Sequence, residues 1–200
     1  MQAIFDSFLN FDISVFQWIQ SIQNEFLDAL MVGITTLGNG GAAFIILGLL
    51  LLITKKYRKA GLAVLVALLA MLLCNDLFLK EFFARPRPFN LLETDPEKYA
   101  FWGKSYVYPE LVSRPTSYSF PSGHTASAFA AAIALLWHNK KLGIPTTIFA
   151  ALMGFSRIYV EVHYCTDVIA GVVSGTICAF IAVLIVKIFY PAIEKKFLNR

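Results

Sequence analysis

Long apolar runs separated by short polar segments dominate the chain and predict helices that cross a membrane. A membrane-spanning helix needs about 20 mostly apolar residues. Runs of sufficient length predict five spans, the first of them bent around glycines 38–41: 27–53, 60–79, 120–137, 144–160 and 168–190. The predicted fold class is therefore all-α, a polytopic transmembrane helical bundle.

The N-terminal segment has a different pattern. Between residues 4 and 25, phenylalanine and isoleucine are mixed with aspartate, asparagine and glutamine. This mixture is typical of an amphipathic helix that lies at the membrane interface. We therefore divide the chain into an N-terminal amphipathic interfacial segment, 1–25, and a transmembrane bundle, 26–200. Five spans with the N-terminus outside are favoured, and six spans with the N-terminus inside are the alternative.

The charge pattern predicts the orientation of the bundle. Basic residues gather at 55–59, 140–141 and 195–196, and short loops rich in lysine and arginine stay on the cytoplasmic side. The other two connections, 80–120 and 156–167, then share the outer face. The outer loop 80–120 holds most of the 8 prolines and many aromatic residues. It is expected to be ordered and partly seated in the membrane.

Composition supports the membrane prediction and narrows the function. Of the 200 residues, 58% are hydrophobic and 15% are charged, whereas soluble domains carry about 25% charged residues. The formal net charge of +4 could indicate nucleic-acid binding. Since the basic residues lie in loops that topology requires to be basic, the expected partner is the lipid bilayer and no nucleic acid.

Cations gather after the second predicted span, in the stretch KEFFARPRP, which holds Lys80, Arg85 and Arg87. Basic residues at a helix end often mark only the membrane boundary. Here they lie on the predicted outer side, where positive charge is scarce. An anionic ligand would explain their presence.

The second cluster is PSGH, residues 121–124, where the third predicted span begins. Unpaired backbone N–H groups and the helix dipole favour an anion at such a position. Gly123 would let a phosphate approach the backbone, and Ser122 adds a hydroxyl donor, although a simple helix cap would use the serine equally well. A cap does not require the imidazole of His124.

The third cluster is SRIYVEVHYCTD, between the last two predicted spans. His163 and Asp167 are four residues apart and would share a helix face. The carboxylate could then hold Nδ1–H of the imidazole and leave Nε2 to attack, while a structural His–Asp pair is the alternative. Arg157 supplies a planar cation suited to phosphoryl oxygens. Glu161, expected to face water, and Cys165 receive no role.

These three clusters converge on one face of one bundle. Together they offer cations and N–H groups for a phosphoryl charge, one imidazole as nucleophile and one as acid, which suits phosphoryl transfer. A metal site is not expected, because the outer carboxylates lack ligand spacing and the arginines would repel a cation.

The clusters resemble the three signatures of the type 2 phosphatidic acid phosphatase superfamily of membrane lipid phosphatases: K-x6-RP, PSGH and SR-x5-H-x3-D. All three match without a gap and in the family's order, and the resemblance covers residues 26–190.

The resemblance implies a mechanism in two steps without a metal or other cofactor. His163 would attack phosphorus and form a phosphohistidine, with Asp167 orienting it. His124 would protonate the leaving oxygen and then activate water. Arg85 lies outside the signature and is at most an auxiliary contact. The groups expected to bind the phosphoryl oxygens are Lys80, Arg87, Ser122, Gly123 and Arg157.

The motifs bind phosphate and not the tail, so they leave the substrate open. Short bacterial members that resemble this chain hydrolyse undecaprenyl diphosphate to undecaprenyl phosphate, and this is the preferred hypothesis. Phosphatidylglycerophosphate and phosphatidic acid are the main alternatives, with lipid A a further one. The expected location is a bacterial plasma membrane, with the active site on the outer face.

Two alternatives come from other classes of protein. Vanadate-binding haloperoxidases share the signature but resemble larger, soluble proteins. A non-catalytic lipid-binding or transport bundle would tolerate the loss of His163.

Overall fold

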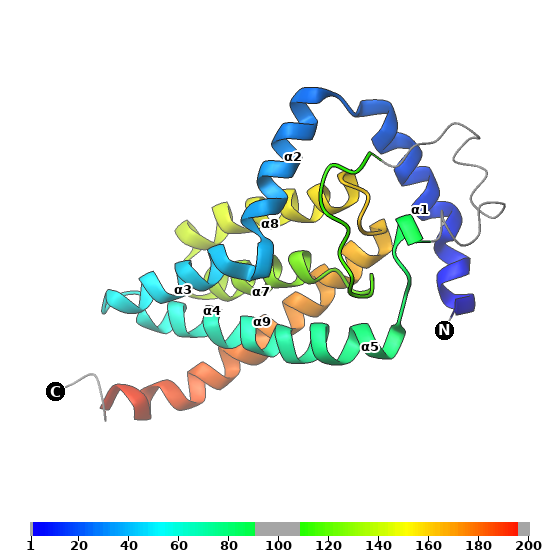
Figure 1. The fold of residues 1–200 in the computed structure, drawn as a ribbon. Helices are drawn as coiled ribbons and strands as arrows, with labels where there is room; N and C mark the ends of the chain where they lie inside the picture. The colour runs from blue at the N-terminus through cyan, green and yellow to red at the C-terminus, as the bar shows by residue number, and fades with distance from the viewer. Residues whose placement is uncertain (1, 91–108, 196–200) are drawn as a thin grey trace.

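The structure, a computed structural model, describes residues 2–90 and 109–195 (Figure 1). All regular elements in these residues are helical, which confirms the predicted all-α class. In chain order they are α1 (Gln2–Ile22), α2 (Glu25–Leu37), the 3-10 turn η1 (Asn39–Gly41), α3 (Ala42–Ile53), α4 (Arg58–Met71), the π-helix η2 (Leu72–Leu79), α5 (Lys80–Phe83), α7 (Gly123–His138), α8 (Lys140–Tyr159) and α9 (Cys165–Ile193). Much of the predicted outer loop, 91–108, lies outside the described residues.

Several helices are long and apolar enough to cross a membrane, which supports a multi-pass membrane protein. Among the described residues there are three: Arg58–Asn90, Lys140–Tyr159 and Cys165–Ala192. The pair α2 and α3 passes the same test as one bent span and makes a fourth. The remaining predicted span, 120–137, corresponds to α7, which has 16 residues. The count of five spans therefore stays a prediction.

The first span bends at the glycines, where the sequence predicted a bend. The axis turns by 45° between the two helices, and Gly40 and Gly41 adopt φ angles of 60° and 68°. Glycine reaches this left-handed region at little cost, whereas other residues are strained there.

The span that starts with α4 changes to a π-helix, η2, before it reaches the Lys80 end of the bundle. The sequence predicted an ordinary helix over 60–79, because apolar periodicity does not distinguish the two. Such π-helical turns are rare and are frequently found at functional sites. The fully buried Asn75 ties this turn to later helices. Its amide lies 3.5 Å from the carbonyl of Pro121, and its side-chain oxygen accepts a 3.0 Å hydrogen bond from Ser174.

Helix α7 lies at the centre of the bundle and packs against α4, α8 and α9 (Figure 1). Its buried side is made largely of alanines, among them Ala126, Ala130 and Ala134. Small side chains let helices in a membrane approach closely. Where α7 meets α9 there is no room for a side chain, since a Cβ at Gly175 would overlap the backbone carbonyl of Ala126.

The basic clusters and the predicted site residues lie at opposite ends of the bundle (Figure 1). At one end, Lys59 of α4 lies 5.9 Å from the ring of Tyr190 near the end of α9. At the other end, Arg87 contacts the carbonyl of Val162 in the α8–α9 connection. The described parts of the two segments predicted to share a face, 80–90 and 109–120 of the first and 156–167 of the second, therefore lie together. Which side of the membrane they face stays a prediction.

Helix α1 lies beside the site end and contacts α8 and α9 (Figure 1). One side of α1 is buried and includes an acidic residue: Phe5, Asp12, Ile13, Phe16 and Ile19. Another side exposes large apolar side chains: Ile4, Phe8, Phe11 and Trp18. The interfacial position of this helix and the division of the chain at residue 25 stay predictions.

The α7–α9 packing generates a matched pair of glycine variants. Gly175→Ala places a methyl group against backbone and should lower the free energy of unfolding by about 1–3 kcal/mol, as overpacking does. Gly33 is exposed in the middle of α2, and a Cβ there meets nothing within 4 Å. Gly33→Ala should therefore raise the free energy of unfolding by about 0.5–1 kcal/mol through helix propensity. Thermal unfolding in detergent compares the two. Equal melting temperatures would contradict the close α7–α9 contact.

Candidate active site

The buried guanidinium of Arg87 joins two motif segments that are far apart in the sequence. Its Nε donates to the carbonyl of Ser117 at 2.6 Å, and Nη1 donates to the carbonyl of Val162 at 2.8 Å. The same Nη1 lies 3.2 Å from Nε2 of His163. The K-x6-RP segment is therefore in direct contact with the predicted nucleophile.

This contact defines the tautomer of His163. Arginine has N–H donors and no acceptor, so Nε2 must accept and carry the lone pair. The proton then lies on Nδ1, which is 3.4 Å from Oδ2 of Asp167 and 3.4 Å from Oγ of Ser119. Both distances are longer than a typical hydrogen bond, although the pairing is the one predicted. The helical geometry assumed for it was wrong, because His163 lies in the connection that precedes α9.

The surroundings of His163 favour its neutral form. Burial lowers the pKa of its imidazole well below the ordinary value, and the neighbouring cations Arg87 and Arg157 lower it further. Lys80 and His124 act in the same direction. The predicted cations and both predicted histidines therefore share one electrostatic environment, and the unprotonated imidazole is the nucleophilic form.

Asp167 is held rigidly in the first turn of α9. Its Oδ2 accepts the backbone N–H of Tyr164 at 3.0 Å and a short hydrogen bond from Ser119. A carboxylate in this turn also interacts favourably with the helix dipole. Its backbone carbonyl accepts the N–H of Ser122 at 3.0 Å. The PSGH segment is thereby attached directly to the segment that carries the His–Asp pair.

The N-terminus of α7 lies against the Asp76–Lys80 ion pair. Ser122 is the N-cap residue, yet its side chain makes no capping bond and accepts a 3.0 Å hydrogen bond from Thr125. A Cβ at Gly123 would lie 2.8 Å from Oδ1 of Asp76 and 3.1 Å from Nζ of Lys80. Glycine is needed at this close approach. The simple capping role of the Ser122 side chain is not observed, and the anion site at PSGH stays a prediction.

Other polar groups hold the remaining site residues. Lys80 pairs with Asp76 at 2.6 Å, and Nε2 of His124 lies 3.0 Å from Oδ1 of Asn39 in the glycine bend. The buried Arg157 donates a short hydrogen bond to Thr35. These partners belong to no recognised motif, and only their spatial proximity identifies them.

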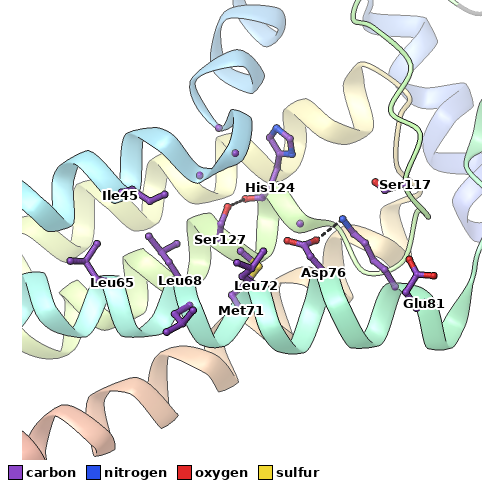
Figure 2. Close-up of a pocket in the computed structure, with 16 residues that line it drawn as sticks. Ile45, Leu65, Leu68, Met71, Leu72, Asp76, Glu81, Ser117, His124 and Ser127 are labelled. Carbon is purple, nitrogen blue, oxygen red and sulfur yellow. Dashed lines mark hydrogen bonds and ion pairs between the residues drawn. The ribbon is translucent and has the colours of Figure 1, made fainter.

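A cavity of about 560 Å³ opens beside these groups. Figure 2 shows His124, Asp76 and Ser117 towards one end, whereas apolar side chains from α3 and α4, including Ile45 and Leu65, line the other. Lys80 and Gly123 also line it. The cavity thus joins a polar head region to an apolar channel.

The predicted nucleophile is covered by other side chains. His163 is 1% exposed, and neither it nor Arg87 or Arg157 belongs to the cavity lining. Nε2 of His163 is therefore occupied by Arg87 and separated from the cavity in this structure.

The expectation that Glu161 faces water is wrong, because the residue is buried. The side chain is 1% exposed, and the backbone adopts a left-handed φ of 54°, a conformation that is strained for a residue other than glycine. Burial raises the pKa of Glu161 to about 8, against a smaller lowering by hydrogen bonds with Gln20 and Gln23. Cys165, which also received no role, is half-buried at the start of α9.

Metal-binding residue types do not cluster in the described parts of the chain. Residues 2–90 and 109–195 contain no group of three or more His, Cys, Asp or Glu side chains arranged to hold a metal ion. The fold and the site together define a helical membrane protein in which a cavity lined by Lys80 and His124 lies at the same end as the buried imidazole of His163.

Comparison with known proteins identifies the family. The PAP2 superfamily matches residues 59–190. The undecaprenyl-diphosphatase BcrC of Bacillus subtilis (strain 168) is 35% identical over 161 residues, which cover 80% of this chain and 76% of that protein. An undecaprenyl-diphosphatase of Sulfolobus acidocaldarius is 33% identical over 178 residues, covering 88% and 79%.

A solved structure agrees. The crystal structure of the first transmembrane PAP2 type phosphatidylglycerolphosphate phosphatase from Bacillus subtilis aligns with a TM-score of 0.66 at 27% identity, over 96% of this chain and 89% of that one. The chain belongs to the PAP2 superfamily, as its motifs predicted. It is accordingly a phosphatase, a hydrolase of phosphate esters or anhydrides.

The buried Glu161 generates a prediction on stability. The folded protein keeps this proton up to about pH 8, whereas the ordinary carboxyl releases it near 4.5. The unfolded state therefore binds fewer protons between these values, and folding stability falls as pH rises through that window. Glu161→Gln should flatten this fall in melting temperature, and the exposed control Glu110→Gln should keep it. An unchanged slope in Glu161→Gln would show that another group titrates.

Proposed function

We propose that this chain hydrolyses undecaprenyl diphosphate to undecaprenyl phosphate at the outer leaflet of a bacterial plasma membrane, without a metal ion and through a phosphohistidine on His163. The observation that carries the proposal is the state of that imidazole. It is neutral, Nε2 points to the Arg87 guanidinium, and Nδ1 points to Asp167.

The first step is the attack of Nε2 on phosphorus. A bound phosphoryl group offers Arg87 an anionic partner in place of Nε2, which frees the lone pair. His124 enters the step as an imidazolium, because the negative charge of the bound substrate favours its protonated form. The N–P bond forms, the P–O bond to the leaving group breaks, and the leaving oxygen takes the proton from this imidazolium, which becomes neutral. Lys80, Arg157, Ser122 and the N–H of Gly123 bind the phosphoryl oxygens, while Asp167 holds Nδ1–H.

The second step releases phosphate. Water attacks phosphorus and gives a proton to His124, and the electrons of the N–P bond return to Nε2. Both histidines end in their starting state.

The cavity supports a lipid as the substrate. Its polar end carries Lys80 and His124, and its other end is lined by leucine and isoleucine side chains of α3 and α4. Such a channel suits a phosphate that carries a long apolar chain. Two relatives named undecaprenyl-diphosphatases, 35% and 33% identical, favour the polyprenyl diphosphate. Phosphatidylglycerophosphate is the second candidate, because the solved phosphatidylglycerolphosphate phosphatase aligns over 96% of the chain.

Phosphate release from a lipid panel tests substrate and mechanism together. The panel holds undecaprenyl diphosphate, phosphatidylglycerophosphate, phosphatidic acid and lipid A at matched surface concentration. We expect undecaprenyl diphosphate to be hydrolysed fastest. His163→Ala and His124→Ala should each lower phosphate release from every lipid by at least about 100-fold.

The third histidine is the matched control, since His138 lies at the opposite end of α7 from His124. His138→Ala should keep wild-type rates. Full activity of a folded His163→Ala variant would refute the phosphohistidine, and a faster rate on another lipid would reassign the substrate.

Inhibitors test the metal-free step. Vanadate resembles the phosphoryl group in the transition state of its transfer. It should inhibit by binding among the predicted phosphate-binding cations beside His163. EDTA should leave the rate unchanged. If chelation abolished activity and a divalent ion restored it, the proposed mechanism would be wrong.

A further inference from the structure

Arg85 is the cation of the first motif segment that the proposed reaction leaves unused. It is 3% exposed, and neither it nor its partners line the cavity. Its Nη1 donates to Oδ1 of Asp167 at 2.6 Å and to the hydroxyl of Thr166 at 2.8 Å. Its Nη2 donates to Oδ2 of Asp12 at 2.9 Å. One guanidinium therefore bridges two buried carboxylates.

Aromatic rings fix the plane of that guanidinium. Its central carbon lies 3.8 Å from the ring centre of Tyr164 and 4.5 Å from that of Phe5. Cation–π contacts of this kind favour arginine over lysine. The fork of Arg85 therefore has a defined orientation towards Asp167.

Asp12 secures the same turn from a different helix. This fully buried residue of α1 accepts the backbone N–H of Thr166 at 2.9 Å through Oδ1 and the hydroxyl of Thr166 at 2.7 Å through Oδ2. The N–H groups of a first helical turn have no partner within the helix. A carboxylate from α1 thus serves as the cap of α9, one residue before Asp167.

The net charge of Arg85, Asp12 and Asp167 also suits the proposed reaction. Arg85 alone beside Asp167 would cancel the negative charge that supports a cationic imidazole. With Asp12 added and both carboxylates ionised, the three side chains carry one net negative charge. The ring of His163 gains a positive charge when Nε2 bonds to phosphorus and Nδ1 keeps its proton.

We propose that Arg85 and Asp12 are positioning residues for the reaction: acting through Asp167, they orient His163 and balance the charge that forms on it. The inference rests on the proposed phosphohistidine step. It assigns α1 a part in catalysis, since Asp12 belongs to that helix.

Two substitutions separate orientation from charge. Asp12→Asn keeps an oxygen for the N–H of Thr166 and removes one charge. Arg85→Lys keeps the charge and removes the fork that bridges both carboxylates. With undecaprenyl diphosphate, each should lower kcat by about 10- to 100-fold, the order of effect when a partner that orients a histidine is lost. KM should stay within about twofold, because neither residue lines the cavity.

A double variant tests the charge argument. Arg85→Gln should lower kcat, but Asp12→Asn combined with Arg85→Gln restores one net negative charge at Asp167. The losses should therefore be less than additive in a double-mutant cycle. Matched controls are Asp6→Asn, exposed on α1, and Arg114→Gln, from the exposed pair with Glu110. Both should keep wild-type kcat.

The outcomes separate this inference from the proposed function. Activity in folded His163→Ala overturns the proposed function itself. If His163→Ala is inactive while Asp12→Asn and Arg85→Lys keep wild-type kcat, only the positioning role is wrong. It is also wrong if kcat falls only in proportion to a lower fraction of folded protein, measured by thermal unfolding on the same samples.

Discussion

The hydrogen bond from Arg87 to Nε2 of His163 sets the protonation state on which this end of the bundle depends. Because arginine cannot accept, the imidazole must present its lone pair to the guanidinium and its proton to Asp167. Burial and the surrounding cations keep the ring neutral. The tautomer and the orientation of the imidazole thus follow from one donor.

Burying so many charges is costly unless each finds partners. The chain offsets this cost with hydrogen bonds and ion pairs between segments that are distant in sequence. Asp167 accepts from Arg85, Ser119 and the N–H of Tyr164, and Arg85 in turn reaches α1. The packing of α7 against α9 places Ser122 on the carbonyl of Asp167. Fold and site therefore depend on the same few contacts.

The sequence was sufficient for the apolar helices, the bend at the glycines and the set of groups around His163. Charge and hydropathy predicted that the described parts of 80–120 lie at the same end as 156–167, because both patterns can be read along the chain. The Asp12–Arg85 pair, the π-helix and the Lys80–Asp76 pair could not be predicted in this way. Each depends on tertiary packing that no local period encodes. Glu161 was misjudged for the same reason, since it lies in a short polar connection that the N-terminal residues cover.

The shortness of α7 has a consequence for which molecules meet the enzyme. Its 16 residues rise about 24 Å at about 1.5 Å per residue, less than the bilayer core of about 30 Å. With the basic turn after His138 at the cytoplasmic boundary, as the charge pattern predicts, the PSGH end lies below the opposite boundary. A lipid can bring its phosphate to that depth by sideways diffusion. In that predicted orientation a water-soluble phosphate has no apolar tail to carry it to this depth, so the short helix favours lipid phosphates over soluble ones.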